Sequence, residues 1–237
     1  MSVYLFIKFK EADFFLSILM LSISKSSLNQ MWKGQHLPSE AGKDKSYFAV
    51  HKTNTGSYFG MVATMDVYGY SPSDGQASVA AIWIGNDDGD NSDLDSIAVG
   101  WEVFPGQYGD SLTHFYTEWT RDAYRSTGCH NMKCPGFQRV SGSEIAPGAV
   151  IQPVSDVNGS QQKITIKVLK DPSTGDWWIH YGFNGPPKPV GFYPANLFDT
   201  LNKKATVIAF GGAVNVVTSH TTHGQWILSF RRSCNTE

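Results

Sequence analysis

Short runs of β-branched and aromatic residues recur along most of this chain, and each run ends in a cluster of turn-forming residues. The runs begin with YFAVHKT at residues 47–53 and continue through ASVAAIWIG, IAVGWEVF, THFYTEWTR, QKITIKVLK, DWWIHYGF and ATVIAFGG to QWILSF at 225–230. Clusters such as SPSDG, PGQYGD and NGPPKP separate them, as in antiparallel hairpins. The sequence therefore predicts an all-β fold, an antiparallel β-sandwich of two large sheets with at most short helical segments.

Two segments show the contrast between strand and helix patterns. In QKITIKVLK, Ile164, Ile166 and Val168 alternate with more polar neighbours, which predicts a strand with one dry face. PANLFDTLNKK, residues 194–204, instead has a Pro entry and an apolar spacing that favour a short helix.

Length and charge limit the number of domains and the kinds of partner. The 237 residues suit one sandwich domain, which we expect at residues 46–237. A formal net charge of −2 gives no attraction to nucleic acid or to anionic membranes, so neither is an expected partner. Residues 14–24 are apolar but too short to span a bilayer. We interpret residues 1–25 as a degenerate secretory signal, with a buried first helix or an incorrectly assigned exon as alternatives, and residues 26–45 as an irregular linker.

The segment GWEVFPGQYGD, residues 100–110, places a carboxylate inside a predicted strand. Successive side chains point to opposite faces of a strand, so Trp101 and Val103 share one face and Glu102 lies on the other. A solvated charge on an exposed sheet face is the simplest interpretation. The alternative is a functional carboxylate on the floor of a groove.

Cysteines and a sequon favour an extracellular setting. Cys129 and Cys134 flank a short loop in TGCHNMKCPGF, and we prefer a disulfide between them to a metal half-site with His130, because no second ligand pair has a zinc-site spacing. Cys234 is then left over. Asn158 begins an Asn-Gly-Ser sequon within a turn, so it would be glycosylated in a secreted protein.

Other chemical motifs are weak. The acidic run NDDGDNSDLD, residues 86–95, lacks the residue order of an EF-hand. His220 and His223 stand in a Thr-rich segment that does not favour the helix their spacing would need. We therefore expect no metal and no cofactor. Serine hydrolases and nucleotide-binding enzymes are disfavoured, because neither a Ser-His-Asp order nor a Gly-rich phosphate loop is found.

Several ordered segments resemble the neprosin family of plant proteins. They are GWEVFPGQYGD, HFYTEWTRDAY, STGCHNMKCPGF, IQPVSD, KDPSTGDWWIHYG, VGFYPANLF and FGGAV, spread over residues 46–223. The resemblance implies a two-sheet β-sandwich. It also implies a secreted glutamic endopeptidase that cleaves after proline in an acidic medium and acts on Pro-rich peptides or proteins.

The resemblance further implies a pair of catalytic glutamates, of which this chain keeps one. Glu102 matches the first, whereas Ala213 in FGGAV stands at the position of the second. Two nearby carboxyl groups work together because one keeps its proton while the other activates water, and a methyl group does neither. We expect both positions to face one groove from neighbouring strands, with activity weak or absent. Glu118 and Glu144 are disfavoured as substitutes because neither lies on the matching strand.

A non-catalytic sandwich is the second functional class. It would bind Pro-rich peptide or glycan in the same groove and use Trp101, Trp119, Trp177 or Trp178 as stacking surfaces, although most such residues belong to cores. The residues after His223 depart from the family pattern, so we also expect the domain either to lack its last strand or to replace it with QWILSF.

Overall fold

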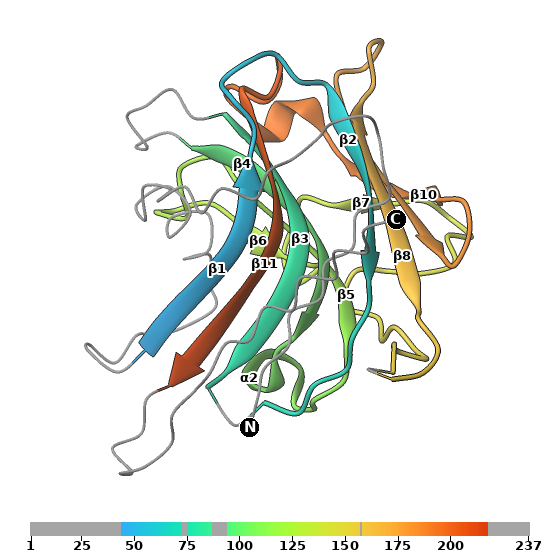
Figure 1. The fold of residues 1–237 in the computed structure, drawn as a ribbon. Coiled ribbons are helices and arrows are strands. Elements are labelled where there is room, and N and C mark those ends of the chain that lie inside the picture. Colours follow the sequence, from blue (N-terminus) through green and yellow to red (C-terminus); the bar gives the residue numbers. More distant parts are fainter. Residues whose placement is uncertain (1–43, 73–74, 87–93, 157, 218–237) are drawn as a thin grey trace, which may run out of the picture.

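Two antiparallel sheets contain almost all of the regular secondary structure (Figure 1). The structure is a computed structural model that describes residues 44–72, 75–86, 94–156 and 158–217. The predicted all-β fold is confirmed. The predicted signal segment, almost all of the predicted linker, His220, His223, Cys234 and the QWILSF strand lie outside the described residues.

The first sheet has six strands in the order β1-β11-β3-β4-β5-β6. Their bounds are β1 Asp44–Lys52, β11 Val207–Val217, β3 Ala77–Asn86, β4 Asp95–Val103, β5 His114–Thr120 and β6 Cys129–His130. Figure 1 shows β1, β11 and β3 side by side as long, twisted strands. The two-residue strand β6 is the last in this sheet.

The second sheet has five strands in the order β2-β8-β9-β10-β7. Their bounds are β2 Gly60–Asp66, β8 Lys163–Lys170, β9 Trp177–Phe183, β10 Lys188–Tyr193 and β7 Gln138–Arg139. The two-residue strand β7 is the last in this sheet, so the segment that runs from β6 to β7 terminates both sheets.

One hydrophobic core lies between the sheets and follows the predicted alternation. Trp101 and Val103 of β4 belong to it, as do Ile164, Ile166 and Val168 of β8. In β8 the intervening side chains are more exposed than these three, so the predicted dry face is confirmed. A second, smaller cluster of buried residues covers the other face of the first sheet.

Helical structure is short. The helix α2, Pro105–Tyr108, forms where the sequence predicts a hairpin turn, and it ends at Gly109, whose positive φ suits a left-handed helix cap. The expected helix at 194–204 is wrong in extent, because only the 3₁₀ turn η1, Ala195–Leu197, forms there. Within the described residues, no helix is long and apolar enough to cross a membrane.

Candidate functional site around Glu102 and His130

Glu102 lies on the face of the first sheet that points away from the main core, as the alternation along β4 predicts. Its register partners are Val79 on β3 and His114 on β5. Only 3% of Glu102 is exposed, so it is not a solvated surface charge. A buried carboxylate is costly unless other groups pair with it, and its partners therefore matter.

Ala213 lies in the same cross-strand row as Glu102, but not on a neighbouring strand. Val79 of β3 pairs with Glu102 on one side and with Ala213 of β11 on the other. The expectation of adjacent strands is therefore wrong, and two strand spacings put the two Cα atoms about 10 Å apart. The row nevertheless brings both positions to one face of the sheet.

Small residues occupy the next row on this face. Gly100 pairs with Ala81, and Ala81 pairs with Gly211. A Cβ atom at Gly100 would lie 1.9 Å from the carbonyl oxygen of Ala80, so this position requires glycine. Small residues therefore line this face, but Ala213 is fully buried, and an open groove beside it is not seen in the described structure.

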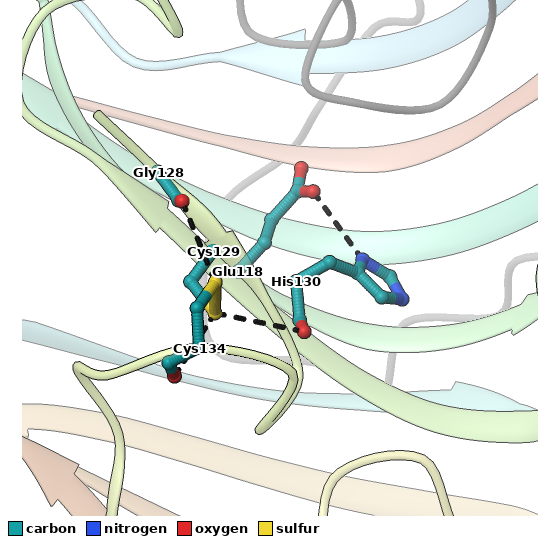
Figure 2. Close-up of a disulfide and its surroundings, with 5 residues drawn as sticks. All are labelled: Glu118, Gly128, Cys129, His130 and Cys134. Carbon is teal, nitrogen blue, oxygen red and sulfur yellow. Dashed lines mark hydrogen bonds and ion pairs between the residues drawn. A yellow bond between two sulfur atoms is a disulfide. The ribbon is translucent and has the colours of Figure 1, made fainter. Parts of the chain in front are cut away.

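His130 joins Glu102 to a second glutamate. Its Nε2 atom lies 2.9 Å from Oε1 of Glu102, and its Nδ1 atom lies 3.6 Å from Oε2 of Glu118. Figure 2 shows the contact between Glu118 and His130, whose backbones are paired on β5 and β6. All three side chains are at least 96% buried, so one imidazole is held between two carboxylates in a desolvated cluster.

A tyrosine fixes the other side of Glu102. The Tyr108 hydroxyl, at the end of α2, donates a hydrogen bond of 2.6 Å to Oε1 of Glu102 and accepts one of 2.9 Å from the side-chain amide of Asn131. The Tyr108 ring stacks in parallel on His114 with centroids 3.7 Å apart. His114 in turn contacts Asp110 at 3.0 Å. Glu102 is therefore oriented from two directions.

The electrostatics of the cluster favour a protonated His130. Burial alone would lower the pKa of His130, but its hydrogen bonds and charge attraction to Glu102 and Glu118 outweigh burial and raise the pKa to about 9. Burial, followed by the nearby glutamates, raises the pKa of Tyr108 and of Tyr116. Both phenols therefore stay neutral, and His130 is the cation of the cluster.

A disulfide holds His130 in place. The Sγ atoms of Cys129 and Cys134 are 2.11 Å apart, which confirms the predicted bond, and Figure 2 shows it directly beside His130. Cys129 lies in the core, whereas the next side chain, His130, points to the opposite face. Within the described residues, no group of three or more His, Cys, Asp or Glu side chains could hold a metal ion.

Other predicted residues lie apart from this cluster. Asn158 is exposed in its turn, and Glu144 pairs with Lys188 on the second sheet. Three of the four candidate stacking tryptophans, Trp101, Trp119 and Trp177, lie in the core. Trp178 is half-buried and contacts Phe192 on the second sheet. These positions do not support an aromatic binding groove beside Glu102.

The sequence pattern does not reveal most of the partners of Glu102. It suggests His130 only as a possible metal ligand and indicates no role for Tyr108, Asn131 or His114. Glu118 is disfavoured by the sequence because it is not on the strand of Ala213, yet it reaches the cluster from β5 through His130. The available signal was the alternation in HFYTEWT, which puts Glu118 on the face of His114.

The comparison with known protein families identifies the family of the chain. A model of the family described as Neprosin matches residues 74–226, which include Glu102, His130 and Ala213 and make up more than half of the chain. The chain therefore belongs to the neprosin family.

Proposed function

We propose that this protein is a secreted glutamic endopeptidase of the neprosin type whose proline-directed activity in acid is greatly reduced by the alanine at position 213. Its substrates would be Pro-rich peptides or proteins. The observation that carries the proposal is the row Glu102–Val79–Ala213, because a methyl group stands on the same face as Glu102 where the second carboxyl group is expected.

The chemical argument concerns the missing acid. A glutamic peptidase needs one carboxylate to take a proton from water and one carboxylic acid to donate to the substrate. Glu102 would take the proton from water, and its contacts with Tyr108 and His130 hold its carboxyl group in place. Losing a general acid typically lowers the rate by about 10²–10⁴-fold, which leaves weak turnover at most.

The test is to restore the second carboxyl group. Ala213→Glu should increase cleavage after proline in a quenched fluorescent peptide at about pH 4–5, where a carboxyl pair shares one proton. The matched control is Ala209→Glu, which adds the same buried carboxyl group to the same face of β11 beside Trp83. No gain with a folded Ala213→Glu protein, or an equal gain with Ala209→Glu, would contradict the proposal.

Secretion is tested separately. The disulfide and the exposed Asn158 support passage through an oxidising compartment. We expect protein recovered from the medium of a eukaryotic expression host to lose mass on deglycosylation, and Asn158→Gln to abolish that loss. An unglycosylated, intracellular product would contradict secretion.

A further inference from the structure

We propose that His130 is the proton donor of the Glu102 site in this chain, and that Glu118 is a positioning residue that acts through His130. The inference rests on the proposed function, since it assigns the acid role that Ala213 cannot perform to another side chain.

The geometry of the imidazole carries the proposal. One ring nitrogen lies 2.9 Å from a Glu102 oxygen and the other 3.6 Å from a Glu118 oxygen. Because each nitrogen faces a carboxylate, both can carry a proton, and the ring is then an imidazolium. The Tyr116 ring stacks on it with centroids 5.7 Å apart. His130 is therefore held at hydrogen-bonding distance from Glu102, the residue that would activate water.

The groups that face His130 define its charge state. They are Glu102 from β4, Glu118 and Tyr116 from β5, and Tyr108 from α2. The two phenols stay neutral because burial and the nearby glutamates raise their pKa values. With a pKa of about 9, His130 keeps its proton at neutral pH, whereas an ordinary carboxylic acid has lost its proton there.

The step balances without a further reactant. Glu102 takes one proton from water while the water oxygen bonds to the peptide carbonyl carbon. The C–N bond then breaks, and the leaving nitrogen takes the proton of His130 Nε2. Glu102 returns its proton to His130, so both groups end as they began. The net result is the addition of one water across the peptide bond.

The pH profile of the remaining hydrolysis distinguishes this assignment from a structural role. We expect the full-length wild-type protein to cleave a Pro-containing fluorogenic peptide weakly, with an alkaline limit at about pH 9. His130→Gln should lower kcat/KM at neutral pH by at least about 100-fold. Glu118→Gln should move the alkaline limit to lower pH, because an amide does not stabilise the imidazolium. His180→Gln, on the second sheet, is the matched control and should change neither quantity.

Each remaining outcome decides between the two proposals. Absence of wild-type turnover at every pH, or a His130→Gln protein with the wild-type rate and profile, overturns the role of His130. If His130→Gln does not fold, an unchanged alkaline limit in Glu118→Gln overturns it instead. Acid activity in Ala213→Glu beside an inactive wild type removes His130 from the reaction and leaves the proposed function intact. An inactive, folded Ala213→Glu protein contradicts the proposed function itself.

Discussion

Replacing His130 by glutamine should remove a pH-dependent part of the stability of the protein. The folded state raises the pKa of His130 from its ordinary 6.5 to about 9, because its hydrogen bonds and attraction to Glu102 and Glu118 outweigh its burial. One pKa unit corresponds to about 1.36 kcal/mol, so this pairing contributes about 3 kcal/mol to the free energy of unfolding.

The direction of the pH effect follows from proton binding. Between pH 6.5 and about 9 the folded protein holds a proton on His130 that the unfolded chain has released. The contribution is therefore complete below pH 6.5 and is lost as the pH rises through about 9. Glutamine does not titrate, so the stability difference between wild type and His130→Gln should shrink across this window.

Urea unfolding of the oxidised proteins at intervals from pH 6 to pH 10 measures this difference. The matched control is His180→Gln, because burial, reinforced by the charge of Lys167, lowers the pKa of His180 and so gives no such loss in the alkaline range. If the difference in unfolding free energy between wild type and His130→Gln changes by less than about 1 kcal/mol from pH 6 to pH 10, the contacts of His130 with Glu102 and Glu118 do not stabilise the imidazolium by about 3 kcal/mol.

Three further predictions concern the scaffold. Trp177→Ala should lower the unfolding free energy by about 3–5 kcal/mol, because Trp177 is fully buried and donates a hydrogen bond to the Leu201 carbonyl; chemical denaturation should show a much smaller loss for the half-buried Trp178→Ala. Gly100→Ala should cost at least about 1–3 kcal/mol, because the new methyl group would overlap the Ala80 carbonyl; an unchanged thermal midpoint would contradict the β3–β4 packing. Reducing the Cys129–Cys134 bond, which spans a sequence separation of 5, should cost only about 2 kcal/mol; calorimetry with and without reductant measures this, and a loss of all structure would contradict it.

The sequence predicts well which side chains face the core between the two sheets, because apolar and polar residues alternate along each strand. Trp101 and Val103 face the core and Glu102 faces away, as the pattern in GWEVF requires. The pattern fails where proline interrupts it. NGPPKP predicts a turn, yet Pro189 lies in β10 and the register shifts between it and Gly191, since a bulge tolerates a residue that cannot donate to the ladder.

The candidate site is less predictable, because its partners come from distant positions in the chain. Glu102, Glu118 and His130 lie on three strands whose order and twist decide whether the side chains meet. Strand alternation assigns each residue to a face but gives no distance between residues of different strands. The sequence also does not predict that β3 lies between the strands of Glu102 and Ala213, because the order of strands in a sheet depends on the topology of the whole fold.

The short strands β6 and β7 also bear on how copies of this protein behave at high concentration. A long, flat edge strand exposes unpaired peptide groups that can recruit another molecule, and proteins suppress this by making edge strands very short. In this protein β6 and β7, each only two residues long, form one edge of each sheet and so leave few unpaired peptide groups there. Among the described strands, β2 is the opposite edge of the second sheet and carries Val62 at 58% exposure. We therefore expect the β2 edge to contribute to self-association in concentrated solution, and Val62→Lys to reduce it.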